Sequence, residues 1–290
     1  MQEAVSSISA PPAALRRHRR AWIALLVILV FFWLDAFHLD LFRRVAGDWS
    51  GYPRMLALAL LAYGPQLLVA LGVAALVAGP RHAAAALGLR GHPFRALLVG
   101  IVLTVPMLIG LASQVPPVLT AQTAIDLLRM ALLPGFGEEL LYRGLLFGLL
   151  FRFAGWGFLP AALLAALVFG AAHLYQGGDP GEAAGIFALT ALGSLWFAWL
   201  YVEWDDDLWV PVALHVLMNA WWIVFPVADN ALGPAWTVGL RLAVLLLAVL
   251  VTLGTARGRG GRKVRGRAWW WGGPAAAPRP AATQARPARR

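Results

Sequence analysis

Two adjacent carboxylates and an arginine stand inside an otherwise apolar stretch of the chain. Glu138 and Glu139 are followed by Arg143, and each such charge at the centre of a bilayer costs roughly 2.5 to 3.5 kcal/mol. Glu139 and Arg143 lie four residues apart with the acid first, the favourable order for a helical ion pair. Glu138 is then the candidate base, although either acid could bend toward Arg143. We therefore expect a functional site, with a purely structural ion pair as the alternative.

Two of the six histidines fall in or near apolar segments, whereas the others lie in basic loops or near the end of a segment. His173 follows Phe169, Gly170 and two alanines, and these small residues would let another helix approach closely. His215 and Asn219 are four residues apart and so share one helical face. Histidine changes its protonation near neutral pH, which suits proton transfer. A single membrane histidine can also simply bond a neighbouring helix.

The segments that must position these side chains are strongly apolar. Hydrophobic residues make up 60% of the 290, charged residues make up 13%, and the mean hydropathy is +0.71. We expect an all-α, polytopic integral membrane protein with about eight transmembrane helices and an intramembrane active-site cavity. The expected spans are residues 21–42, 56–78, 95–113, 125–151, 159–174, 183–202, 208–227 and 236–254. The first is too long for a signal peptide, so we expect an uncleaved anchor.

The net charge of +10 comes largely from arginines near the two ends of the chain. Clusters at residues 16–20 and 257–267 fit the positive-inside rule and contact with anionic lipid headgroups. They predict a multi-pass protein of the cell (inner) membrane with both termini in the cytoplasm and an even number of spans. No long polar segment supplies a basic face, so we expect no nucleic-acid partner. The chain has no cysteine, which excludes disulfides and a thiolate nucleophile.

Three regions follow from this pattern. Residues 1–20 form a basic cytoplasmic N-terminus, and residues 21–255 form a transmembrane helical domain. Residues 256–290 are rich in Arg, Pro and Ala, which predicts a disordered tail. Within the fourth span, Pro134 and Gly135 predict a kink that frees backbone groups for neighbouring helices or water to satisfy.

The polar residues together resemble a known family. Glu138-Glu139-x-x-x-Arg143, Phe169-x-x-x-His173 and His215-x-x-x-Asn219 are similar to the three motifs of the CPBP family, which includes CAAX prenyl protease 2, the bacteriocin-processing intramembrane proteases and the Abi or CAAX amino-terminal proteases. The resemblance covers a core at about residues 125–227. It implies an intramembrane protease in which Glu138 and His173 activate a water. His215 and Asn219 would stabilise the oxyanion, while Glu139 and Arg143 would lock the helix and tune the base.

The resemblance also raises the question of a metal ion. Some members of the family have been described as metalloproteases, in which case Glu138, His173 and His215 would be the natural zinc ligands. The His-Glu-x-x-His pattern is absent from this chain. We therefore favour a glutamate mechanism that requires no cofactor, with zinc as the alternative.

The expected partners are the lipid bilayer and a peptide or membrane-protein substrate. The Ala, Arg and Gly bias, with Lys263 as the one visible lysine, is typical of a high-GC bacterial proteome. A bacterial peptide or membrane protein is therefore expected in place of a prenylated CAAX protein. Two other classes remain: a non-catalytic membrane scaffold of the same fold, and a proton-coupled transporter. No inverted repeat is visible, which counts against the transporter, and the intact set of presumed catalytic residues favours the enzyme.

Overall fold

The computed structural model of the chain describes residues 13–271, and within them helices are the only regular elements beyond one isolated bridge. Six helical segments are long and apolar enough to cross a membrane, which confirms the all-α, polytopic class. These segments are Arg17–Ala46, Gly51–Ala78, Pro93–Ala112, Phe158–Gln176, Pro180–Glu203 and Ala235–Ala256. The two other expected spans also coincide with helices, one formed by residues 121–152 and one by the shorter apolar helix Trp209–Val224.

The first half of the chain contains α1 (Ala13–Phe37), α2 (Asp40–Ala46), α3 (Gly51–Leu58), the π-helix η1 (Ala59–Tyr63), α4 (Gly64–Ala78), α5 (Ala83–Ala86) and α6 (Pro93–Ala112). Residues 121–152 follow as one continuous run, which we call the motif helix. It consists of α7 (Ala121–Asp126), η3 (Leu127–Leu132), α8 (Leu133–Glu138), η4 (Glu139–Gly148) and α9 (Leu149–Arg152). The second half contains α10 (Phe158–Ala171), α11 (Pro180–Glu203), α12 (Trp209–Val224) and α13 (Ala235–Ala256).

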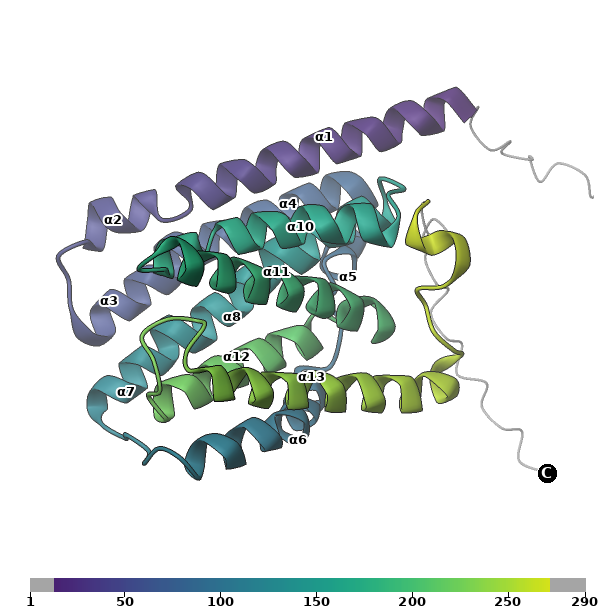
Figure 1. The fold of residues 1–290 in the computed structure, drawn as a ribbon. Coiled ribbons are helices and arrows are strands. Elements are labelled where there is room, and N and C mark those ends of the chain that lie inside the picture. Colours follow the sequence, from purple (N-terminus) through teal and green to yellow (C-terminus); the bar gives the residue numbers. More distant parts are fainter. Residues whose placement is uncertain (1–12, 272–290) are drawn as a thin grey trace, which may run out of the picture.

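The motif helix is the centre of the bundle. Every residue of η4 is buried, as expected for a helix that is covered on all sides by other helices. Helices α1, α4, α10 and α11 all contact η4, and α12 contacts η3 and α8. Figure 1 shows α1 along one edge of the molecule and α6 along the opposite edge, with the motif helix between them. The acidic pair therefore lies on the most enclosed element of the fold.

The motif helix changes from the α-helical to the π-helical hydrogen-bonding pattern on both sides of α8. Residues 127–132 and 139–148 are π-helical, whereas the intervening α8 carries Pro134. A proline cannot donate a backbone hydrogen bond, so the turn before it must satisfy a carbonyl in another way. π-Helical turns are rare and concentrate at functional sites. The kink expected at Pro134 is therefore replaced by two π-helical segments within a continuous helix.

The described N- and C-terminal segments lie at the same end of the bundle. The Arg20 side chain lies next to Gly155, and Trp271 forms the isolated bridge with Trp156. This placement agrees with an even number of crossings. The acidic loop after α11 lies at this end too, where Asp206 pairs with Arg152 at 3.1 Å. The assignment of this end to the cytoplasm stays a prediction.

The structure gives a different picture for the first part of the expected disordered tail. Residues 257–271 contact the bundle, and the buried Glu203 carboxylate accepts the backbone N–H groups of Lys263 and Val264 at 3.1 to 3.2 Å. The Trp269 ring also packs edge-on against Phe158. Composition alone could not reveal these contacts, because they depend on a buried acid in another helix. The rest of the tail (272–290) and residues 1–12 lie outside the described residues.

Candidate active site

The two acids of the motif helix have different surroundings. Glu139 is fully buried and its Oε1 lies 3.1 Å from Nη1 of Arg143, which is 1% exposed. The ion pair expected from the i, i+4 spacing is therefore present. The Glu138 side chain is 31% exposed and makes no such pair with an arginine. Of the two carboxylates, Glu139 is held inside the bundle and Glu138 is partly accessible.

His215 of α12 faces both acids. Its Nδ1 lies 2.7 Å from Glu139 Oε1, the same oxygen that pairs with Arg143. Its Nε2 lies 3.8 Å from Glu138 Oε2. Because a carboxylate can only accept, Nδ1 donates its proton to Glu139, which fixes the orientation of the imidazole ring. Arg143, Glu139 and His215 form one continuous polar chain inside the bundle.

Aromatic rings surround the buried guanidinium. Arg143 Cζ lies 4.8 Å from the centroid of Phe169 in α10 and 5.2 Å from that of Phe197 in α11. A cation held against an aromatic face is stabilised by the quadrupole of the ring, most strongly where water is excluded. The motif phenylalanine therefore contributes to the environment of the Glu139–Arg143 pair.

His173 joins this group through Phe169. The two rings lie 4.4 Å apart, and the His173 Nδ1 bonds the Phe169 carbonyl at 2.7 Å. Since a carbonyl oxygen only accepts, Nδ1 is the donor, and in neutral His173 the Nε2 is left as a proton acceptor. The structure gives His173 no hydrogen bond or ion pair with Glu138. As expected, Gly170 allows close approach, because a Cβ there would meet the Phe187 ring of α11 at 2.9 Å.

Asn219 lies one turn after His215 and also faces the motif helix. Its Nδ2 donates to the Met130 carbonyl at 3.1 Å. Met130 is four residues before Pro134, so its carbonyl is the one that loses a helical donor at the proline. The expectation that a neighbouring helix satisfies the freed backbone is met by this side chain. An amide nitrogen carries two hydrogens, which leaves Asn219 one further donor.

Sequence reasoning missed two polar residues that contact the motif helix from the first two spans. Tyr142 donates its hydroxyl to Asp35 of α1 at 3.1 Å. Gln66 of α4 donates to the carbonyl of Gly137, directly before Glu138, at 2.7 Å. Both Asp35 and Gln66 are polar residues within apolar spans, and that signal could have drawn attention to them.

The zinc alternative requires Glu138, His173 and His215 to lie around one point. Among residues 13–271, no group of three histidine, cysteine, aspartate or glutamate side chains is arranged to hold a metal ion. His215 and His173 each use Nδ1 in a hydrogen bond, and these bonds leave the Nε2 atom of each ring as the one that would face a metal ion. We derive no step through a metal.

Two cavities lie beside the motif helix. One is lined by residues of α1, η1 and α4, including Gln66, and the other is lined by residues of α3, α7, η3 and α12, including Val216. Val216 also touches the backbone of α8, because a Cβ on Gly135 would meet it at 2.6 Å. Neither cavity is lined by Glu138 or His173. The expected cavity over the catalytic groups therefore stays a prediction.

The fold defines a polytopic membrane protein, and its three motifs meet around the buried chain of Arg143, Glu139 and His215. Residues 120–221 match the family described as type II CAAX prenyl endopeptidase Rce1-like, and this similarity agrees with the resemblance of the three motifs. The match spans the motif helix, α10, α11 and the part of α12 that carries His215 and Asn219. Comparisons with curated proteins and with solved structures give no match.

Proposed function

We propose that the protein is an intramembrane endopeptidase that hydrolyses a peptide bond of a membrane-associated protein or peptide. The observation that carries this proposal is the division of the two acids. Glu139 is engaged with Arg143 and His215, while the neighbouring Glu138 is partly exposed and free of an arginine partner. Hydrolysis of an amide needs a carboxylate that can take a proton from water, and Glu138 is suited to that task.

His173 assists Glu138 in activating the water. Its Nδ1 bonds the Phe169 carbonyl, so its Nε2 can accept a proton and later return it to the leaving amine. For the chemistry to occur, the peptide carbonyl and the water must lie between Glu138 and His173. Phe169 supports this arrangement, since it packs against His173 and against Arg143 beside the acids.

His215 and Asn219 donate to the oxyanion that forms when water attacks the carbonyl. Asn219 retains one amide hydrogen after its bond to Met130, and His215 donates through Nε2 when it carries both protons. Preorganised donors of this kind typically contribute about a hundred- to a thousandfold in kcat each. Glu139 and Arg143 are positioning residues, because they hold His215 and the helix backbone rather than the substrate.

The favoured mechanism needs no metal, and zinc bound by Glu138, His173 and His215 is its alternative. A peptide or membrane protein of a bacterial cell is the proposed substrate, in preference to a prenylated CAAX protein. Its scissile bond reaches the site from within the bilayer or from the membrane surface. We place the protein in the cell membrane with both termini in the cytoplasm.

The test is cleavage of a quenched fluorescent peptide library by purified protein in detergent. Wild type is compared with Glu138→Ala and His173→Ala, each with and without a strong chelator. Matched controls are Asp48→Asn and His82→Ala, which change an exposed carboxylate and an exposed histidine away from the site. We expect cleavage by wild type and both controls, and a loss of about a hundred- to ten-thousandfold in the two site variants.

Chelator decides the metal question within the same experiment. Unchanged activity supports the glutamate mechanism, whereas loss that added zinc restores supports the metal alternative. If folded wild type cleaves nothing in the library, the scaffold and transporter classes move ahead of the protease, and proton-coupled flux in liposomes becomes the next measurement.

A further inference from the structure

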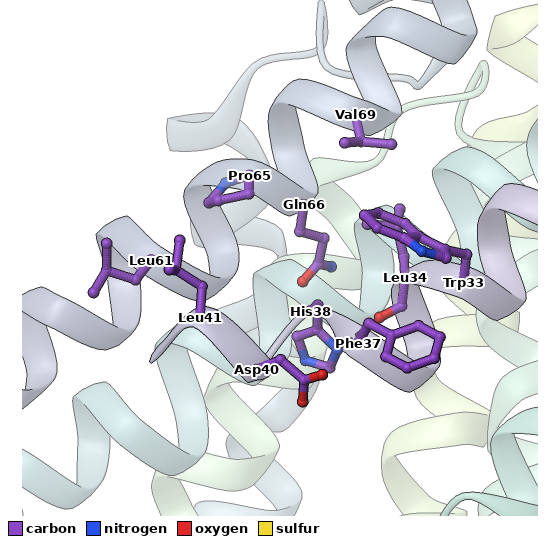
Figure 2. Close-up of a pocket in the computed structure, with 10 residues that line it drawn as sticks. All are labelled: Trp33, Leu34, Phe37, His38, Asp40, Leu41, Leu61, Pro65, Gln66 and Val69. Carbon is purple, nitrogen blue, oxygen red and sulfur yellow. Dashed lines mark hydrogen bonds between the residues drawn. The ribbon is translucent and has the colours of Figure 1, made fainter. Parts of the chain in front are cut away.

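A cavity of about 420 Å³ lies between the first two spans, and no part of the proposed mechanism uses it. Its walls come from α1, α2, η1 and α4, and most of the lining side chains are apolar, among them Trp33, Phe37, Leu61 and Val69. Figure 2 shows these side chains around a central amide, that of Gln66. Trp33 and Phe37 are both more than half exposed, so the rim of the cavity presents aromatic surface.

Gln66 connects this cavity to the candidate active site. Its side chain is 1% exposed, and its Nε2 donates to the carbonyl of Gly137, which directly precedes Glu138. The other end of the amide, Oε1, is buried and accepts no hydrogen bond. A buried acceptor without a donor costs about 1 to 3 kcal/mol. An occupant of the cavity that donates to Gln66 Oε1 would recover this free energy.

Two further polar side chains on the lining supply acceptors, whereas the indole N–H of Trp33 is a donor. His38 donates Nδ1–H to the Leu34 carbonyl at 2.9 Å, which in the neutral ring leaves Nε2 as an acceptor. Asp40 contributes a carboxylate, 3.6 Å from Arg43. In Figure 2 the Gln66 amide points toward His38. The cavity therefore combines apolar walls with acceptors and calls for an apolar ligand that carries N–H groups.

The hydrogen-bonding groups of the cavity favour a peptide over a lipid as its occupant. An acyl chain fills apolar space but has no donor, and a phosphate group brings only further acceptors. The ammonium of a phosphatidylethanolamine headgroup is a donor, but it is charged and belongs at the membrane surface, whereas Gln66 contacts the middle of the motif helix. A stretch of peptide with large apolar side chains offers both apolar surface and one backbone N–H per residue. Peptide recognition by backbone hydrogen bonds and side-chain pockets is a common binding mode.

We propose that the cavity between α1 and α4 is a substrate subsite that receives an apolar stretch of the peptide, with a backbone N–H donating to Gln66 Oε1. The proposal rests on the proposed peptidase function, and it gives the first two spans, which lie outside the matched residues 120–221, a role in substrate binding. Because Gln66 also holds the Gly137 carbonyl, the bound segment would run alongside the residue that precedes Glu138.

The absence of cysteine from the chain allows a clean test by single-cysteine labelling. Val69→Cys places a thiol in the cavity, whereas Leu68→Cys places one on the exposed face of the same helix, where Leu68 is 70% exposed. Leu61→Cys and Leu60→Cys form a second pair of the same design, in case one variant folds poorly. Each variant also carries Glu138→Ala, so that binding is measured without turnover. The readout is the rate of modification by a small maleimide with and without a pool of apolar peptides.

We expect the peptide pool to slow labelling of the cavity thiols by about tenfold at ten times its Kd, and to leave the exposed thiols unchanged. Equal rates at both positions of each pair, with or without peptide, would overturn the proposal. Protection by phosphatidylethanolamine that peptide does not displace would identify the cavity as a lipid site instead. If wild type cleaves peptides but the pool does not protect the cavity thiols, the subsite proposal is wrong and the peptidase proposal stands. If the pool protects the cavity thiols but wild type cleaves no peptide, the cavity binds peptide and the peptidase proposal is wrong.

A substitution of Gln66 provides a second test of the proposal. Gln66→Leu in the Val69→Cys protein removes the acceptor, and we expect it to weaken protection by peptide about tenfold. The matched control is Gln122→Leu, the same substitution at an exposed position of α7. Protection that is unchanged in Gln66→Leu would show that the peptide does not use this acceptor and would overturn that part of the proposal.

Discussion

His215 Nδ1 lies 2.7 Å from Glu139 Oε1, and this one contact decides how the two adjacent acids differ. The same carboxylate oxygen pairs with Arg143, so Glu139 joins a residue of its own helix to a residue of α12. The arrangement resembles an aspartate that orients a catalytic histidine in other hydrolases. In the proposed mechanism Glu139 therefore acts through position and charge, and Glu138 is the acid that remains for chemistry.

Replacing each acid by its amide separates these roles. Glu139→Gln leaves the Arg143 guanidinium buried without a charge partner, and we expect it to lower the free energy of unfolding by about 3 to 5 kcal/mol. Glu138→Gln changes a group that is 31% exposed and has no arginine partner, so the stability should remain near that of wild type. Thermal unfolding of the purified variants in detergent measures both effects. Equal destabilisation by the two substitutions would contradict the division of roles.

The bond from Asn219 to the Met130 carbonyl can be tested with a double-mutant cycle. Asn219→Ala should destabilise the protein by about 1 to 3 kcal/mol, because the carbonyl loses its donor. Pro134→Ala restores a backbone N–H that can donate to Met130, so in that background the cost of Asn219→Ala should be smaller. Additive costs in the cycle would show that Asn219 does not compensate for the proline. Activity of Asn219→Ala should fall in both backgrounds, since its proposed role at the oxyanion does not depend on the bond to Met130.

Phe169 should affect activity through the groups that it contacts. Phe169→Leu keeps an apolar side chain but removes the ring beside Arg143 and His173. We expect a loss of about 1 to 2 kcal/mol in stability and a fall in kcat that exceeds any change in KM. Phe153→Leu is the matched control, because it removes a ring from Arg152 at the end of the motif helix, away from the acids. A fall in kcat of the same size in both variants would exclude a specific role for Phe169.

Glu203 should hold the segment that follows α13. Glu203→Gln weakens the acceptor for the backbone N–H groups of Lys263 and Val264, and we expect trypsin to cleave after Arg262 and Lys263 several times faster than in wild type. Glu182→Gln changes an acid of the opposite end of α11 and serves as the control. Cleavage of the tail at the wild-type rate in Glu203→Gln would show that other contacts hold it.

The sequence was sufficient to predict the class of fold and the pairing within one helix. Every apolar run that was expected as a span coincides with a helix, and the Glu139–Arg143 pair follows from spacing alone. The contact of His215 with Glu139 could not be predicted in this way, since it depends on how α12 packs against the motif helix. Spacing along the chain leaves that rotation undetermined.

The contributions of the first two spans were hidden for a related reason. Asp35 and Gln66 belong to no recognisable motif, and only the packing of α1 and α4 against residues 137–142 reveals their partners. The structure of segment 257–271 was not predicted, because its arginine and glycine content is typical of disorder. The buried Glu203 carboxylate, which bonds the backbone of this segment, belongs to another helix. For Asp35 and Gln66, a polar residue within an apolar span was the available signal.

The most direct test of the central claim is peptide cleavage in heavy-oxygen water by wild type and by Glu138→Gln, followed by mass spectrometry of the products. The account predicts that wild type forms a new carboxyl terminus that carries one heavy oxygen, and that Glu138→Gln, folded and with an unchanged unfolding temperature, forms almost none. Equal labelled product from both proteins, or no product from folded wild type with any peptide of the library, would contradict the proposal that Glu138 activates water for hydrolysis.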